Sequence, residues 1–429
     1  MLLRNLLFFI LSLLSFNLIG QEVFKDTVNL TLQQADSVFI KQNLSLLAEK
    51  CNINSAKAQI IQAKLFTNIT IAATQNVINN EYRTMGTSKW LDVSDKGEST
   101  AQIQKLFRLA GKRNKQIQLA ELTANKEEQI YFDLLRTLKY SLRSDFYNLF
   151  YLSQIVKVYD KEIASMSKLI EAYQNQYEKG FISKKELLRL RSALFSLENE
   201  KMGFSTQIIA TQNDFNVIMH TSNIFYIPHF DLAYLSKFAP DQLKLQVLID
   251  TAYVHRYDYK MAQSDLKIHE VNLSYQKSLA VPDLTLSAGW DKNGGYIHNY
   301  NFVGMQIDLP FFNKNQGNIK SAKFDLESSQ YKLRSAEEIV KSEVLGAYAN
   351  AIQTNQLFNK FDNTFMADLD KLSQEMLNNF EKKNISLIEF LDYYDAYKQN
   401  AVQLNTLLYN RINAFENLNF SVGKEVISK

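Results

Sequence analysis

Residues 135–177 read LRTLKYSLRSDFYNLFYLSQIVKVYDKEIASMSKLIEAYQNQY. Apolar side chains recur here in steps of three and four residues, averaging about 3.5, which is the period of a coiled coil. They are Leu135, Leu138, Leu142, Phe146, Leu149, Leu152, Val156, Tyr159, Ile163, Met166, Ile170, Tyr173 and Tyr177. The chain has no proline before Pro228, so we expect one helix from about Lys112 to Glu178. At 1.5 Å per residue this helix is about 100 Å long, more than a compact globular domain needs.

The chain is predicted to reverse direction directly after this helix. Gly180 favours the left-handed conformation that ends helices, and Phe181 and Ile182 follow it. Ser183 with Glu186 three residues later forms a capping box, which begins a new helix. We expect this return helix to extend to about residue 219, and its apolar residues are Leu187, Leu190, Leu194 and Leu197. The two helices together predict a long antiparallel hairpin.

The same pattern recurs about 203 residues later. One predicted helix carries Phe358, Phe361, Phe365, Leu369, Leu372, Met376 and Phe380. A turn over 382–386 follows, and the return helix carries Leu387, Leu391, Tyr394, Ala401, Leu404 and Leu408. Glu178, Lys179, Ile182-Ser183 and Glu186 match Glu381, Lys382, Ile385-Ser386 and Glu389. This agreement at one structural junction indicates an internal duplication.

Each half also contains two short segments with β character. Apolar and polar residues alternate over 67–77 and 101–107 in the first half, and over 283–290 and 302–309 in the second. Each pair is predicted to form a hairpin of strands long enough for a tilted membrane strand. Aromatic residues that could form a membrane-interface girdle stand near the strand ends: Trp90, Trp290, Tyr296 and Tyr300. A small soluble hairpin beside the coiled coil is the alternative.

Two hairpins cannot close a barrel by themselves. Unpaired strand edges are not tolerated in lipid, so strands that span a membrane must be completed by other subunits. The predicted fold class is therefore mainly α with a small β part, and it requires an oligomer if the strands span a membrane.

The N-terminus is predicted to be a cleaved secretory signal. Arg4 precedes a short apolar run from Leu6 to Leu14, and a small residue, Gly20, precedes the polar Gln21. We therefore assign residues 1–20 to the signal peptide, with an N-terminal membrane anchor as the alternative. Cys51 is the only cysteine, which excludes an internal disulfide. No later stretch is apolar enough to be predicted as a membrane-spanning helix.

Composition excludes several function classes. The formal charge is +3, and no basic patch with interleaved aromatic residues is present, so a nucleic-acid partner is not expected. The chain has few residues that interrupt helices, with 13 glycines and 4 prolines. Its five histidines are dispersed without metal-ligand spacing, and no catalytic set or phosphate-binding glycine loop is found. We therefore predict no enzyme activity, no metal site and no cofactor.

These features resemble the TolC-like outer membrane efflux protein family. The segments that carry the resemblance in the first half are Leu30-Thr31-Leu32-Gln33-Gln34-Ala35, Leu65 to Ile71, Leu106-Phe107, Ala110-Gly111-Lys112-Arg113 and Gly180-Phe181-Ile182-Ser183. Those in the second half are Val281 to Leu286, Leu309-Pro310-Phe311-Phe312-Asn313, Gly317, Phe415-Glu416-Asn417-Leu418 and Gly423. Leu65-Phe66 lacks the proline that Pro282 supplies in the second half, which is one departure from the family's pattern.

The resemblance implies one TolC-like domain over 21–429. It would contain repeat one, about 30–223 with its hairpin tip at 179–184, and repeat two, about 241–423 with its tip at 382–387. It implies a homotrimer in the outer membrane, in which each chain gives four strands to a shared transmembrane β-barrel and its helices to a periplasmic tunnel. The implied partners are a periplasmic adaptor (membrane fusion) protein, an inner-membrane pump reached through that adaptor, and outer-membrane lipid. The implied function is a passive export duct of a tripartite efflux or type I secretion system.

The resemblance also assigns roles at the tips. Glu389 and Asp392 lie three residues apart, which places both carboxylates on one helical face. In the resembling family, acidic residues at these positions form rings at the periplasmic constriction, and rings of acids select cations. A solvated helix face is the alternative. The tip residues expected to contact the adaptor are Gly180, Phe181, Ile182, Ser183, Asn384, Ile385 and Ser386.

Two other classes of function compete with the export duct. A periplasmic coiled-coil scaffold or chaperone would need no alternating strands with aromatic ends. A periplasmic hydrolase would need a clustered polar site, which the sequence does not show. The sequence does not identify the cargo, because drugs, metal ions and polypeptides are selected by partner proteins.

Overall fold

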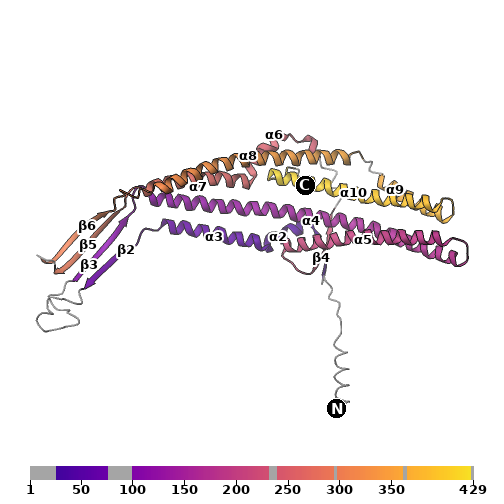
Figure 1. The fold of residues 1–429 in the computed structure, drawn as a ribbon, viewed down its shortest axis with the longest axis horizontal. Coiled ribbons are helices and arrows are strands. Elements are labelled where there is room, and N and C mark those ends of the chain that lie inside the picture. Colours follow the sequence, from indigo (N-terminus) through magenta and orange to yellow (C-terminus); the bar gives the residue numbers. More distant parts are fainter. Residues whose placement is uncertain (1–25, 76–98, 231–238, 294–296, 361–364, 427–429) are drawn as a thin grey trace, which may run out of the picture.

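The computed structural model describes residues 26–75, 99–230, 239–293, 297–360 and 365–426. The molecule is elongated, with a β-sheet at one end and two helical hairpin tips at the other (Figure 1). It is mainly helical with a small strand part, as predicted. The predicted signal peptide, Trp90 and Tyr296 lie outside the described residues.

One helix, α4 (Lys112–Glu178), extends along the molecule from the sheet to the tip, with the bounds that the sequence predicts. Its coiled-coil seam is confirmed, because Leu142, Phe146 and Met166 are at most 1% exposed. The seam ends before Tyr177, which is 36% exposed near the tip. The return helix α5 (Lys184–Met219) packs antiparallel to α4 and completes the predicted first hairpin.

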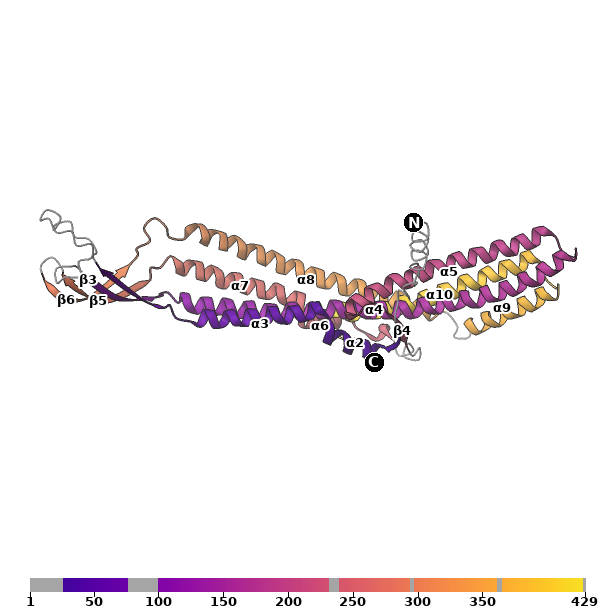
Figure 2. The same cartoon turned by 90° about the horizontal axis from the view of Figure 1, so that it is seen from below.

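Helix α4 is long enough to belong to two helical layers, one next to the sheet and one next to the tips. Towards the sheet, α4 lies between α3 (Leu44–Lys64) and α7 (Tyr257–Leu279), and α8 (Gln316–Phe358) packs on α7 (Figure 2). Towards the tips, α4 lies between α5 and α10 (Leu387–Val422), and α9 (Phe365–Glu381) packs on α10. In the described part of the chain no helix is both long and apolar enough to cross a membrane.

The prediction of one helix from Phe358 to Phe380 in the second half is wrong. Helix α8 ends at Phe358, and α9 begins at Phe365. Asn359 and Lys360 form a closing turn, in which their amides donate to the carbonyls of Asn355 and Leu357.

The sheet contains four antiparallel strands in the order β2-β3-β5-β6. Both predicted hairpins form: β2 (Ile69–Gln75) pairs with β3 (Ser99–Phe107), and β5 (Leu284–Asn293) pairs with β6 (His298–Ile307). The described strand bounds differ from the prediction by up to four residues, and residues 76 and 77 of the first predicted strand lie outside the described residues. Residue 67 lies outside β2, and the Thr67 hydroxyl donates to the Leu106 carbonyl.

The two hairpins are joined by a pairing that the sequence does not predict. Strand β3 pairs with β5 over eight residues, from Thr100 opposite Asp291 to Phe107 opposite Leu284. The buried Lys112 ammonium reinforces this junction, because it lies 2.7 Å from both the Asp283 carboxylate and the Val281 carbonyl. One chain therefore supplies a continuous four-stranded sheet.

The middle of the molecule holds a second, two-stranded sheet, which is also absent from the prediction. Strand β1 (Asp26–Thr31) pairs in parallel with β4 (Ile224–His229). Helix α2 (Leu32–Gln42) follows β1, and the 3-10 turn Pro240–Gln242 and α6 (Leu245–His255) follow β4. These short elements pack on the long helices in the middle of the molecule, and we call them the belt.

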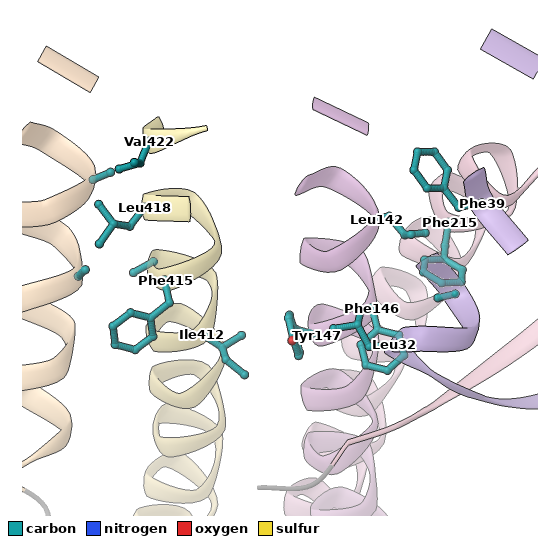
Figure 3. Packing of buried hydrophobic residues seen from close by; sticks show 14 of the residues in the cluster. Leu32, Phe39, Leu142, Phe146, Tyr147, Phe215, Ile412, Phe415, Leu418 and Val422 are labelled. Atoms are coloured by element: carbon teal, nitrogen blue, oxygen red, sulfur yellow. The ribbon is translucent and has the colours of Figure 1, made fainter. Parts of the chain in front are cut away.

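The main apolar core lies within this belt (Figure 3). Phe39 of α2, Leu142 and Phe146 of α4 and Phe215 of α5 are fully buried in it. A buried guanidinium stabilises the same region. Arg143 lies 3.0 Å from Asp36, 3.1 Å from Glu416 and 3.0 Å from Glu425, and so ties α2, α4 and the C-terminal segment together.

Candidate functional site

The first tip has the geometry that the sequence predicts. Gly180 has φ +76°, and its amide donates to the Tyr177 carbonyl at 2.9 Å. The Phe181 amide donates to the Gln176 carbonyl at 2.9 Å, which completes a Schellman motif. The capping box between Ser183 and Glu186 is present in both directions. Phe181 is 72% exposed, so the tip presents an aromatic ring to solvent.

The second tip repeats this geometry with a different residue in the strained position. Lys383 takes the place of Gly180 and has φ +60°. The Asn384 amide donates to the Asn379 carbonyl at 2.9 Å, as in the first tip. Ile385 is half-buried against a second apolar cluster, which contains Phe380 and Phe390. Asn384 and Ser386 are exposed. Both tips lie at the same end of the molecule, opposite the sheet (Figure 2).

The two candidate gate acids are exposed at the start of α10. Glu389 also has a local structural role, because its carboxylate accepts the Ser386 amide at 2.8 Å in the capping box. This backbone hydrogen bond holds the pKa of Glu389 below its ordinary value. Asp392 lies one helical turn further along α10.

An aromatic stack fixes the start of α10 beneath these acids. Phe390 is 1% exposed, and its ring stacks on Phe380 of α9 with 4.5 Å between centroids. Phe380 in turn stacks on Tyr173 of α4 at 5.5 Å. Leu391 packs against the same cluster.

Polar contacts join α10 to the first hairpin. The Tyr394 hydroxyl donates to the Glu162 carbonyl on α4, with 2.6 Å between the oxygens. The Lys398 ammonium lies 2.8 Å from Glu200 on α5, and Glu200 accepts a second hydrogen bond from the Tyr159 hydroxyl at 2.9 Å. We call Tyr394, Lys398, Glu200 and Tyr159 the tip tether.

The electrostatics of the tip tether favour its charged form. Burial opposes the charge on Lys398, but Asp395 and Glu200 outweigh it and raise the pKa of Lys398. Burial likewise opposes the charge on Glu200, and hydrogen bonds from Lys398 and Tyr159 outweigh it and lower the pKa of Glu200. The pair is therefore ionised at neutral pH.

The tip tether is not among the features predicted from the sequence. A signal for it was present, because Lys398 stands between Tyr397 and Ala401 in the apolar stripe of α10, where a charge must be paired. Its partner Glu200 is 198 residues away, and no sequence pattern connects the two. Among the described residues, no group of three or more His, Cys, Asp or Glu side chains could hold a metal ion.

The sheet, the joined helical layers and the paired tips together form the architecture that the predicted resemblance implies. No family model matches the chain. A relative by sequence is the cobalt-zinc-cadmium resistance protein CzcC of Cupriavidus metallidurans, which is 21% identical over 293 residues. The alignment covers 68% of this chain and 66% of CzcC, slightly less than two thirds of the relative's length.

Solved structures agree with this fold over nearly the whole chain. The outer membrane protein VceC of Vibrio cholerae has a TM-score of 0.72 at 15% identity, covering 92% of this chain and 96% of VceC. The CmeC outer membrane channel of Campylobacter jejuni has a TM-score of 0.74 at 12% identity, covering 92% and 87%. The open state of the MtrE outer membrane channel of Neisseria gonorrhoeae has a TM-score of 0.69 at 14% identity, covering 92% and 89%.

These similarities confirm the predicted resemblance at the level of the fold. The solved proteins are described as outer membrane proteins and channels, in agreement with the outer-membrane location expected from the sequence.

Proposed function

We propose that this chain is one subunit of a homotrimeric outer-membrane channel, a passive duct of a tripartite efflux system that extends into the periplasm. The four-stranded sheet carries this proposal, because its two faces differ in polarity and its two edges are open. Export through a duct requires no catalytic chemistry in this chain.

The register of the sheet determines which side chains share a face. Residues directly opposite each other on neighbouring strands point the same way, and side chains alternate along each strand. One face, the apolar face, carries Ile69, Ile71, Ile103, Leu286, Val303 and Met305. The other, the polar face, carries Thr70, Gln102, Gln104, Ser287 and Gln306. We assign the apolar face to lipid and the polar face to the channel lumen.

The apolar face is exposed in the single chain. Ile71 is 77% exposed, Met305 75% and Val303 88%. A surface of large apolar side chains this exposed is costly in water and favourable in hydrocarbon. Lys105 and, by strand alternation, Lys292 are charged exceptions on this face. The Lys105 ammonium donates to the Thr67 carbonyl at the end of the sheet next to the helices.

The open edges support closure by identical chains. Within the described residues, the outer edges of β2 and β6 pair with no other strand. Helices α3 and α8 are likewise the outer members of the layer that follows the sheet. Three copies joined edge to edge would form a barrel of about twelve strands and leave no edge in lipid.

The same proposal assigns roles in gating to the two acids and in adaptor contact to the two tips. Glu389 and Asp392, tripled by symmetry, would line the periplasmic constriction, while the tip tether and the aromatic stack hold it closed. Gly180 to Ser183 and Asn384 to Ser386 would contact a periplasmic adaptor, which connects the channel to an inner-membrane pump. The equivalent Schellman motifs and capping boxes of the two tips support the inferred duplication into two repeats.

A candidate cargo class is divalent metal cations. It is supported by the relative CzcC, described as a cobalt-zinc-cadmium resistance protein, and by the exposed acids at the start of α10. Deletion of the gene should sensitise cells to zinc, cobalt or cadmium more than to drugs. Sensitisation to drugs alone would contradict this cargo assignment and leave the channel proposal intact.

The alternative is a scaffold that never enters the membrane, for which the apolar face has no use. The test is to fractionate cells and analyse the protein by gel electrophoresis with and without heating. We expect recovery with outer membranes, a requirement for detergent, and a trimer that dissociates on heating. Recovery as a soluble periplasmic protein would refute the proposal.

A further inference from the structure

The four connections between strands and helices all expose large apolar side chains. The outer connections carry the most exposed ones: Phe66 at 72% between α3 and β2, and Phe311 at 72% and Phe312 at 97% between β6 and α8. The inner connections carry Leu109 at 40% between β3 and α4, and Val281 at 41% between α7 and β5. We call these four connections with their flanking residues, 64–68, 105–115, 277–283 and 308–314, the collar.

The collar is also strongly basic. It contains eight Lys and Arg residues and only two acids, Asp283 and Asp308. One of these acids is already paired, because Asp283 binds the buried Lys112. Arg113 stacks over the Phe66 ring at 4.0 Å, so cationic and aromatic groups are interleaved. This combination suits a binding partner in which an apolar layer lies directly beside a negatively charged layer.

Another copy of the chain could not cover the whole collar. The strand order β2-β3-β5-β6 places the connections of Phe66 and Phe312 at the two edges, where neighbouring subunits would meet. The connections of Leu109 and Val281 lie in the interior of the sheet, out of reach of a neighbour. A lipid surface, in contrast, reaches all four connections. It is also continuous with the apolar face of the sheet, which ends at the collar with Phe107 and Ile307.

We infer that the collar binds the anionic phospholipid headgroups of the periplasmic leaflet and so fixes how deeply the channel sits in the membrane. This inference rests on the proposed channel function. Aromatic and apolar side chains would lie at the interface between headgroups and hydrocarbon, and exposed cations such as Lys64, Arg108 and Lys314 would contact phosphate. An anionic lipid should therefore stabilise the trimer more than a zwitterionic one.

The test compares two lipids on purified, detergent-solubilised trimer. Phosphatidylglycerol or phosphatidylcholine is added to the micelles, and the temperature at which the trimer dissociates is measured on gels. The collar variant is Lys64→Gln with Arg108→Gln and Lys314→Gln. The matched control carries the same types of change far away, at exposed residues of the first tip: Lys184→Gln, Lys185→Gln and Arg189→Gln.

We expect phosphatidylglycerol to raise the dissociation temperature above that in phosphatidylcholine for the wild type and the control, because a ligand of the trimer stabilises it. In the collar variant this difference should fall by more than half. A collar variant that keeps the full difference while still conducting ions overturns the headgroup inference and leaves the channel intact. A collar variant whose trimers fail equally in both lipids assigns these residues to the subunit interface and also overturns it. A wild-type chain recovered as a soluble monomer overturns the channel proposal itself.

Discussion

The hydroxyl of Tyr394 on α10 donates a hydrogen bond to the backbone carbonyl of Glu162 on α4, with 2.6 Å between the two oxygens. This contact joins the second hairpin to the first through a backbone atom, which cannot rotate away as a side chain can. Tyr394 follows the candidate gate acids Glu389 and Asp392 in α10 and lies within about one and a half helical turns of both. An opening movement of α10 away from α4 would have to break it.

Tyr394→Phe removes this hydrogen bond and keeps the buried ring. A hydrogen bond of this kind contributes about 0.5–1.5 kcal/mol, which would shift the equilibrium between closed and open tips roughly two- to tenfold per chain. We expect a higher open probability of single channels in planar bilayers. Tyr393→Phe is the matched control, because Tyr393 is the neighbouring residue and is 46% exposed. Equal effects of the two variants would show that the Tyr394 hydrogen bond does not hold the tips closed.

The tip tether also predicts a pH dependence. The lowered pKa of Glu200 means that its stabilising effect is present at neutral pH and is lost as the pH falls through that lowered value, below the ordinary 4.5. The raised pKa of Lys398 preserves its charge until the pH exceeds the ordinary 10.5. We therefore expect the tip tether to contribute no change in open probability around neutrality and an increase below pH 4.5.

Variants separate the tip tether from other acids in this test. Lys398→Met should raise the open probability at neutral pH and flatten its increase on acidification. Lys201→Met removes a comparable but more exposed contact between α5 and α4, to Asp160, and should keep the wild-type pH profile. An unchanged acid response in Lys398→Met would exclude Glu200 as its source.

The assignment of the sheet faces makes adjacent residues behave differently. Ile71 lies on the apolar face and Thr70 on the polar face. An arginine facing hydrocarbon near the bilayer midplane costs about 2–4 kcal/mol, whereas one facing the lumen remains hydrated. Ile71→Arg should therefore reduce the amount of heat-sensitive trimer in the outer membrane, and Thr70→Arg should leave it near the wild-type amount. The reverse order would exchange the two faces.

The sequence predicts the features of the fold that depend on local patterns. The bounds of α4, the left-handed Gly180 and both capping boxes follow from periodicity and from residues within four positions of each other. The pairing of β3 with β5 and the parallel pairing of β1 with β4 are not predicted, because each joins segments more than 170 residues apart. The end of α8 at Phe358 is not predicted, because the apolar spacing in the sequence continues beyond it.

In the candidate site, too, the sequence predicts the residues that local patterns define and does not predict the long-range contacts. The acids and tip residues are identified by spacing and resemblance, and Glu389 proves to have a capping role as well. The contacts of Lys398 and Tyr394 with the first hairpin depend on how two distant hairpins pack, which no local pattern encodes. The exposed fractions and the register of the sheet were needed to decide which side of each strand is apolar.

The capping role of Glu389 determines how its proposed gate function must be tested. An alanine there would remove both the charge and the hydrogen bond to the Ser386 amide, whereas glutamine at this position can still complete a capping box. We therefore expect Glu389→Gln with Asp392→Asn to weaken the block of single-channel current by divalent cations, because up to six carboxylates of the trimer lose their charge. The trimer and the barrel should be unaffected. Glu186→Gln makes the same change in the capping box of the first tip and should leave the block unchanged. If the double variant retains wild-type cation affinity, Glu389 and Asp392 form part of a solvated helix face, and the constriction is lined by other residues.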